Sequence, residues 1–328
     1  MEKIKYLIIR LSSIGDIVLT TPVVRGIKQQ IDNAEVHFVT KKKHASIVRS
    51  NPYIDKVHVL NENFNILLEE LENEQFDYII DLHQNIRSNR IKSRLKAAAF
   101  SFEKLNFQKF LLIQFKINRL PEKHVVDRYL KTVSVFDVEN DGNGLDFFIP
   151  ESEQFDKAGL PKLFQKGFMV FVIAGTYSTK KLPVPKIIEI CNSVDFPVIL
   201  LGGKNEMEAA REIDTETGEN VFSLVGKLSL NQSASLVRDA RLVLANDTGL
   251  MHIAAAFKKK ILSFWGNTVP EFGMFPYQPH PDSKIIEVKD LKCRPCSKLG
   301  YDKCPKKHFN CMNQIPVEEA IQWIKTNY

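Results

Sequence analysis

The chain has 328 residues, of which 44% are hydrophobic and 26% charged, and its formal net charge is +6. This length exceeds what one hydrophobic core usually supports, so we expect two domains, and the ordinary composition excludes a disordered or fibrous protein. No stretch reaches the roughly 18 apolar residues of a membrane-spanning helix, and no signal peptide is evident near Lys3 and Lys5, so we expect a cytoplasmic protein.

The first half of the chain alternates short apolar runs, typical of strands, with amphipathic stretches, typical of helices. We predict strands at Ile4–Ile9, Glu35–Thr40, Lys56–Leu60, Asp77–Asp81 and Leu145–Ile149. We predict helices at Asp16–Ile31, Lys42–Ser50 and Phe64–Asn73, and mainly helical structure over residues 85–136. Pro22 should kink the first of these helices or restart its first turns. Continuous apolar strands indicate a parallel sheet covered on both faces.

Residues 150–167 are polar and contain the break Gly159-Leu160-Pro161, which is typical of an interdomain linker. The second half repeats the alternation. We predict strands at Phe168–Ala174, Val198–Leu201, Val221–Leu224, Leu242–Ala245, Lys260–Trp265 and Ile285–Val288. We predict helices at Val184–Ser193, Glu206–Asp214, Asn231–Asp239, Gly249–Ala256 and Val317–Lys325. The fold class is therefore α/β with two doubly wound parallel sheets, and the expected domains are residues 1–160 and 161–328.

Positive charge is concentrated in residues 84–131, which hold twelve Lys or Arg side chains against three carboxylates. A surface of this kind suits an anionic partner such as a phosphorylated lipid, an acidic glycan or a nucleic acid. Solvated helix faces explain the same charges equally well. The apolar stretch Phe107–Ile117 lies inside this region; we expect it to be buried, and contact with a bilayer is the alternative.

Two turns with a glycine beside a carboxylate follow predicted strands, one at residues 12–16 and one at residues 246–252. Each has the order strand, glycine turn and helix, which points backbone N–H groups at one place and suits an anion such as phosphate. Asp16 is either a general base at the carboxyl end of the first strand or a helix cap. A helix N-terminus would weaken the base, whereas desolvation would strengthen it.

The second turn is accompanied by a polar loop, residues 175–183, which offers hydroxyl groups such as that of Thr176 and the ammonium of Lys180. Lysine neutralises a phosphate as a point charge, although a solvated loop has the same composition. Backbone N–H groups of Thr248 and Gly249 suit a diphosphate, and Asp247 would cap the helix or orient the loop. His252 either contacts the ligand or is a structural residue. Neither a P-loop nor a Gly-x-Gly-x-x-Gly motif is present, which argues against a P-loop ATPase or a nicotinamide dehydrogenase.

Four of the five cysteines lie close together near the C-terminus, at Cys293, Cys296, Cys304 and Cys311. The odd total of five cysteines and the expected cytoplasmic location argue against a disulfide framework. A structural zinc site with four thiolate ligands, a redox pair at Cys293 and Cys296, and a packed cysteine-rich loop are the three interpretations. His308 could replace one zinc ligand.

Taken in order, these motifs resemble glycosyltransferase family 9, the ADP-heptose:lipopolysaccharide heptosyltransferases and their relatives. The resemblance rests on RLSSIGDIVLTT from Arg10, FDYIIDLHQNIRS from Phe76, residues 175–183, NDTGLMHIAAA from Asn246, FWGNT from Phe264, and the cysteine-containing segment 293–312. It covers most of the chain. It implies a GT-B architecture, in which two Rossmann-like domains face a central cleft, with the acceptor domain first and the nucleotide-sugar domain second.

The resemblance also implies an inverting, metal-independent transfer, so that no cofactor is required for catalysis. Asp16 matches the proposed general base, and Ser13, Gly15 and Arg87 fall on the acceptor side. The matching donor-side residues are Thr176, Lys180, Asp247, Thr248, Gly249 and His252. The implied partners are a nucleotide-diphosphate sugar such as ADP-heptose and an anionic lipid-linked glycan, with peripheral contact at the inner face of the inner membrane and no nucleic acid.

This sequence departs from the family on the donor side at two positions. Leu182 stands where relatives commonly have tryptophan, and Asn231 stands near the position where some heptosyltransferases carry a glutamate that contacts the nucleotide ribose. Two other functions fit parts of the sequence. A nucleotide-sugar epimerase would use the same fold without an acceptor, and a zinc-containing nucleic-acid-binding protein would use the cysteines and the basic region.

Overall fold

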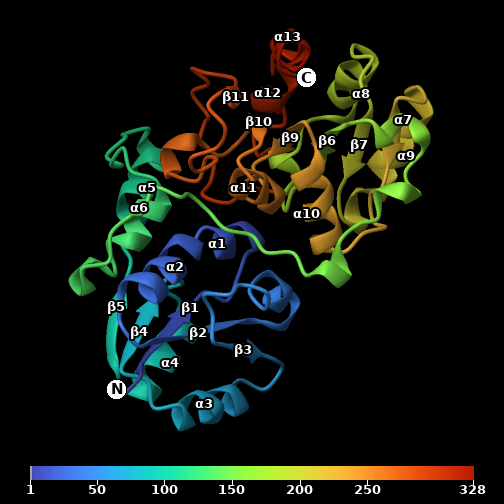
Figure 1. Ribbon diagram of the computed structural model, residues 1–328. Helices are drawn as coiled ribbons and strands as arrows, with labels where there is room; N and C mark the ends of the chain where they lie inside the picture. The colour runs from blue at the N-terminus through green and yellow to red at the C-terminus, as the bar shows by residue number, and fades with distance from the viewer. Residues whose placement is uncertain (1) are drawn as a thin grey trace. The chain divides into compact units, whose positions relative to one another are not determined.

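The computed structural model describes residues 2–328, which form two compact units (Figure 1). The first unit contains the chain up to Leu105 together with Lys123–Pro150. The second contains Asn106–Glu122 together with Glu151–Tyr328. The chain therefore contributes a short segment to the second unit before it completes the first.

A five-stranded parallel sheet in the order β3-β2-β1-β4-β5 forms the centre of the first unit. Its strands are β1 (Ile4–Ile9), β2 (Ala34–Lys41), β3 (Lys56–Leu60), β4 (Tyr78–Asp81) and β5 (Ala98–Ser101). The side chains at the end of β1 are fully buried, as expected for a central parallel strand. Ile9 lies opposite Val39 and Asp81, so β1 and β4 end together at one edge of the sheet.

Five α-helices and two 3₁₀ helices complete the first unit. They are α1 (Ile14–Val18), α2 (Thr21–Gln30), α3 (Phe64–Asn73), α4 (Ile86–Leu95), α6 (Val125–Leu130), η1 (Lys42–Ile47) and η2 (Ser134–Phe136). The single helix predicted over Asp16–Ile31 is wrong, because the chain breaks at Leu19-Thr20 and Pro22 lies in the first turn of a new helix. The prediction that Pro22 restarts the helix is confirmed. The helix predicted at Lys42–Ser50 is the shorter η1.

Two further predictions for the first unit fail for physical reasons. The edge strand β5 was missed inside a region predicted to be helical, because it has only four residues and its alanines favour a helix. The strand predicted at Leu145–Ile149 is irregular, although Leu145 and Phe147 are buried. Its backbone does not join the sheet: the Asp146 N–H donates to the Thr21 hydroxyl of α2, and the Asp146 carboxylate pairs with Arg25.

A six-stranded parallel sheet in the order β11-β10-β9-β6-β7-β8 forms the centre of the second unit. Its strands are β6 (Met169–Val172), β7 (Val198–Leu201), β8 (Val221–Ser223), β9 (Leu242–Asn246), β10 (Lys260–Trp265) and β11 (Lys284–Glu287). All six were predicted within a few residues. Phe171 of β6 and Phe264 of β10 stack with ring centroids 6.0 Å apart in the core.

The second unit has eight α-helices and five 3₁₀ helices. The α-helices are α5 (Asn106–Phe115), α7 (Lys162–Gln165), α8 (Val184–Asn192), α9 (Met207–Glu216), α10 (Leu230–Asp239), α11 (Gly249–Ala256), α12 (Asn310–Asn313) and α13 (Val317–Asn327). The 3₁₀ helices are η3 (Glu151–Glu153), η4 (Lys157–Gly159), η5 (Ser178–Lys180), η6 (Lys204–Glu206) and η7 (Pro270–Phe272). The segment read as a polar linker includes α7, whose Phe164 is buried.

The helix α5 packs within the second unit on one side only. Leu112 is buried against Val269 and Phe272, and Figure 1 shows α5 beside this part of the chain. The outer side carries Phe107, Phe110 and Phe115, which keep 68%, 49% and 62% of their surface exposed. The expectation that this stretch is buried is therefore wrong for three of its phenylalanines. Among residues 2–328, no helix combines the length and apolarity needed to cross a membrane.

Candidate active site

In the first unit, Asp16 lies in the first turn of α1, just after β1. Its Oδ2 accepts hydrogen bonds from the Ser13 hydroxyl (2.7 Å) and the Ser13 N–H (3.1 Å). Its Oδ1 forms an ion pair with the Arg10 Nη2 at 2.6 Å, and 23% of the side chain is exposed. The carboxylate therefore both caps the turn and reaches solvent. It also occupies the place where an external anion would meet this short helix.

Arg10, which was not predicted from the sequence as a site residue, forms the ion pair that orients the Asp16 side chain. The guanidinium donates to Ser12 O (2.8 Å), to Leu82 O and to the Tyr129 hydroxyl (2.9 Å), and the residue is buried. Burial alone would lower the pKa of Arg10, but the Asp16 carboxylate and the other partners outweigh it, so this pKa is raised. A charged residue directly after an apolar central strand was the signal in the sequence.

The neighbouring strand β4 ends at Asp81, a fully buried carboxylate that organises the following loop. Its Oδ1 accepts from the N–H groups of His83 (3.0 Å) and Gln84 (2.7 Å). Its Oδ2 accepts from the Ser88 hydroxyl and the Lys92 ammonium, both at 2.8 Å. These four donors satisfy the buried charge and fix the start of α4, so Asp81 is a positioning residue for this loop.

His83 lies in this loop as a neutral imidazole. Its Nδ1 is buried and has no hydrogen-bond partner within residues 2–328. Burial, together with the charges of Arg10 and Lys104, lowers the pKa of His83 to about 4. A neutral ring beside the Asp16 turn can donate or accept a hydrogen bond but carries no charge at neutral pH.

Arg87 lies in the first turn of α4 and lines an open cavity of about 660 Å³ with Lys41, Lys42 and Lys43. Asn63 and Phe64 also line this cavity. The cations come from the end of β2, the start of η1 and the start of α4, so three elements bring positive charge to one hollow. Glu62 lines the same cavity, which leaves an excess of positive charge suited to an anionic group. That Arg87 contacts the acceptor stays a prediction.

In the second unit, the turn between β9 and α11 gathers the predicted donor residues. The Asp247 Oδ2 accepts from the Lys180 ammonium at 2.5 Å and from the Thr268 hydroxyl at 3.0 Å. Thr248 is the N-cap of α11, and its Oγ1 is buried with no hydrogen-bond partner in the described part of the chain. Gly249 begins α11 with ordinary helical backbone, so its small size and not a positive φ distinguishes it.

Asn246, the last residue of β9, joins this turn to the loop that follows β6. Its amide donates to Ala174 O (3.1 Å), and its Oδ1 accepts from the Leu182 N–H (3.0 Å). These bonds fix both ends of the loop that contains Lys180, while Thr179 bonds to Tyr301 O. Asn246 was not assigned a role in the sequence; a polar residue ending an apolar strand was the signal.

The other two residues predicted on the donor side are Thr176 and His252. Thr176 is exposed in the same loop as Lys180, and His252 is buried in the second turn of α11. The two family departures are both structural: Leu182 is buried, and the Asn231 amide donates to Glu153 Oε2 at 2.9 Å. A donor contact by Thr176 or His252 stays a prediction.

The four late cysteines lie near one another without forming a compact set. The Cys296 thiol donates to Cys293 O (3.0 Å), and the Cys293 sulfur lies 3.9 Å from His308 Nε2. Burial, with a smaller effect of the neighbouring thiols, raises the pKa of Cys296 to about 11 and that of Cys311 to about 12. Within the described residues, no three of these thiols lie within 4.8 Å of one another.

Comparisons with known proteins agree with the expected family. A family model described as glycosyltransferase family 9 (heptosyltransferase) matches residues 65–305. A lipopolysaccharide heptosyltransferase 1 from Campylobacter coli is 26% identical to this chain over an alignment 349 positions long, which covers 98% of each chain.

Two solved structures have the same fold. A glycosyl transferase family 9 protein from Veillonella parvula has a TM-score of 0.78 at 20% identity and covers 99% of this chain and 98% of its own. The ADP-heptose lipopolysaccharide heptosyltransferase II of Escherichia coli has a TM-score of 0.76 at 16% identity and covers 98% of both chains. The expected fold class, GT-B with two parallel-sheet α/β units, is confirmed.

The neutral state of His83 can be measured directly. The pKa of His83 is about 4 in the folded chain, whereas an unfolded histidine has a pKa of about 6.5. Between these two values the unfolded state binds the proton and the folded state does not, so the free energy of unfolding should fall as the pH drops from about 6.5 to about 4. Proton NMR of the imidazole, assigned by loss of the signal in His83→Gln, should show no midpoint above about pH 5. A midpoint at the ordinary histidine value would contradict the burial and charge effects described above.

Proposed function

The chain belongs to glycosyltransferase family 9, and we propose that it moves a heptose-like sugar from a nucleotide diphosphate, ADP-heptose or similar, to a lipopolysaccharide-core or related surface glycan. Its relatives include a named lipopolysaccharide heptosyltransferase that aligns over nearly the whole chain. The observation that carries the proposal is the grouping of Lys180, Asp247 and Thr248 at the start of α11.

The donor diphosphate is proposed to bind at this turn. The N–H groups at the start of α11 have no partners within the helix, and the helix dipole favours negative charge there. The unpartnered hydroxyl of Thr248 supplies another donor. Lys180 lies within the same group, where Asp247 holds its ammonium in place, so it can neutralise charge on the leaving diphosphate. Asp247 is then a positioning residue.

Asp16 is proposed to activate the acceptor. It would accept the proton of the acceptor hydroxyl while that oxygen bonds to the anomeric carbon and the bond from this carbon to the diphosphate oxygen breaks. The electron pair of that bond leaves with the diphosphate, so one displacement inverts the anomeric centre without a metal ion. Arg10 and Ser13 keep the carboxylate in one orientation.

The acceptor is proposed to be an anionic lipid-linked glycan. The hollow lined by Arg87 and Lys41–Lys43 can bind a phosphate or carboxylate of such a molecule, with Ser13 and Gly15 at the neighbouring strand end. An epimerase would not need this acceptor-side charge and would turn over the donor alone. A nucleic-acid-binding protein would not need the grouping at α11, and family membership favours neither alternative.

Two substitutions test the roles of Asp16 and Lys180, because one should change the turnover rate and the other the affinity for the donor. Asp16→Asn should lower kcat by about 10²–10⁴-fold and leave the donor Kd nearly unchanged, because the base does not contact the diphosphate. Lys180→Met should weaken donor binding by about tenfold to a hundredfold, since a charged hydrogen bond is lost. Steady-state kinetics and calorimetric titration with ADP-heptose separate the two. Full turnover by Asp16→Asn, or unchanged affinity in Lys180→Met, would exclude the corresponding role.

Peripheral membrane contact is proposed for the outer side of α5. Three exposed phenylalanines stand on it, and Ile117 directly beyond the helix is 48% exposed. Arg119 follows Ile117, and Lys109 lies within the helix, and this combination of apolar and basic side chains suits an anionic membrane surface. A lipid-linked acceptor would be found at such a surface, in the proposal at the inner face of the inner membrane.

A vesicle-binding measurement tests this contact. Fully burying one phenylalanine contributes about 1.5–3 kcal/mol, so replacing Phe107, Phe110 and Phe115 by serine should lower partitioning onto anionic vesicles at least about tenfold. Ile66→Ser, at an equally exposed position of α3, serves as the matched control and should bind as the unmodified chain does. Equal partitioning of the triple variant and the control would rule out this surface.

A structural metal site at the four late cysteines is also proposed, with zinc as the ion. The thiols influence one another's ionisation, and His308 lies beside Cys293, so modest movements of the loop would bring tetrahedral ligands together. Thiolate rather than thiol is the ligand, so binding would release protons.

Metal analysis of the purified chain tests this site. Cys296→Ser should retain about one equivalent of zinc fewer than the unmodified chain, because closed tetrahedral sites need all four ligands. Cys191→Ala, which removes a buried thiol of α8, is the control and should leave the zinc content unchanged. An identical zinc content in both variants would remove the proposal, and iron in place of zinc would change the assigned ion.

A further inference from the structure

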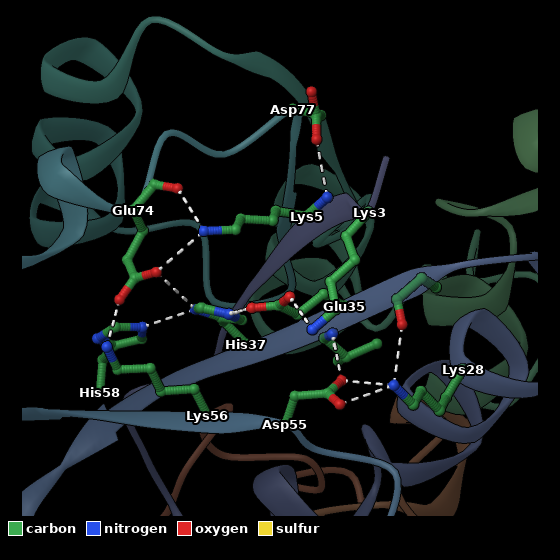
Figure 2. Close-up of polar contacts among 12 residues, drawn as sticks. Lys3, Lys5, Lys28, Glu35, His37, Asp55, Lys56, His58, Glu74 and Asp77 are labelled. Carbon is green, nitrogen blue, oxygen red and sulfur yellow. Dashed lines mark hydrogen bonds and ion pairs between the residues drawn. The ribbon is translucent and has the colours of Figure 1, made fainter. Parts of the chain in front are cut away.

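Two buried histidines face each other on neighbouring strands of the first unit, outside the residues assigned to catalysis. His37 lies on β2 and His58 on β3, both side chains are fully buried, and the rings stack with centroids 5.1 Å apart. The edge of Phe76 packs against both rings. Figure 2 shows this pair surrounded by carboxylates and lysine ammonium groups from several elements.

The outer nitrogen of each ring faces a carboxylate. The His37 Nε2 lies 2.8 Å from Glu35 Oε1, and the His58 Nδ1 lies 2.5 Å from Glu70 Oε1. Glu35 also forms an ion pair with the Lys3 ammonium at 2.9 Å, so its carboxylate accepts from both neighbours. The outer nitrogens therefore carry the ring protons, which fixes the tautomer of a neutral imidazole.

A consequence follows for the inner nitrogens. His37 Nδ1 and His58 Nε2 are 2.9 Å apart, and in two neutral rings with protonated outer nitrogens both would present lone pairs. Two lone pairs at this distance repel each other, so a cation, either an added proton or a metal ion, must lie between or beside the two nitrogens.

A third ligand atom lies beside this pair. Glu74 Oε2 is 3.9 Å from His37 Nδ1, and the ligand atoms of Glu74 and the two histidines all lie within 4.8 Å of one another. Burial tends to raise the pKa of Glu74, but hydrogen bonds from Lys56 and Lys5 outweigh it and keep this carboxylate ionised. Lys5 also donates to the backbone oxygen of Glu74, so it keeps one partner if Oε2 binds an ion (Figure 2).

We propose that His37 Nδ1, His58 Nε2 and Glu74 Oε2 form a binding site for a divalent transition-metal ion of the zinc class, with Glu35 and Glu70 orienting the two imidazoles. Zinc bonds of about 2.0–2.2 Å need tetrahedral ligand atoms roughly 3.3 Å apart, so the imidazoles would separate slightly and Glu74 would approach. Water completes the coordination. The ion would link β2, β3 and the connection from α3 to β4, a structural role independent of sugar transfer.

Cobalt binding to the full-length, chelator-treated chain tests this site and separates it from the cysteines. A site of two histidines and a carboxylate should take up one cobalt ion without the intense sulfur-to-metal absorption that thiolate ligands give. His58→Gln should abolish that component, and Glu35→Gln should weaken it about 10–100-fold. His280→Gln, at an exposed histidine of the second unit, is the matched control and should leave it intact.

A measurement on the unmodified chain covers the case in which His58→Gln does not fold. Zinc added beyond the one equivalent that the proposed cysteine site would take should displace the imidazole NMR signals of His37 and His58, with saturation after one further equivalent. Signals unchanged by saturating zinc would mean that a shared proton holds the two rings together and would overturn the proposal. Retention of the sulfur-free cobalt component in a folded His58→Gln variant would overturn it as well.

Discussion

The parallel direction of each sheet is the constraint on which the function of this protein depends. Because all strands of a parallel sheet end at the same edge, residues far apart in sequence lie together beyond those ends. In the first unit this edge gathers Arg10, Asp16 and Asp81 after β1 and β4. In the second it gathers Lys180 and Asp247 after β6 and β9. Neither group requires a long helix or a special loop fold.

Both groups consist of a cation and a carboxylate held together before any substrate is present. Arg10 is buried and has several backbone and side-chain partners, so it holds the Asp16 carboxylate in one orientation. Lys180 has Asp247 as its one side-chain partner among residues 2–328, so its ammonium has donors left for the diphosphate that we propose to bind here. The two cations thus differ in their number of partners, which agrees with the roles proposed for them, positioning for Arg10 and diphosphate binding for Lys180.

The sequence predicted the strands of both sheets better than the parts that join them. Apolar runs such as Val198–Leu201 are strands because burial on both faces demands that composition. The strand β5 was predicted as helix although its backbone pairs with β4, and its side chains are largely exposed. The segment around Leu145 was predicted as a strand because it is apolar and buried, although its backbone does not join the sheet. Residues of short motifs such as Asp16 could be found in advance. The partners that orient them depend on tertiary contacts between distant segments, as the bonds of Asn246 show.

The central claim is that the turn between β9 and α11 holds the diphosphate of the sugar donor. A crystal structure of the chain with a non-transferable ADP-heptose analogue tests it most directly. The account predicts phosphate oxygens within hydrogen-bond distance of the backbone N–H groups at Thr248 and Gly249 and of the Lys180 ammonium. A diphosphate bound elsewhere, with Lys180 still paired to Asp247 alone, would contradict it.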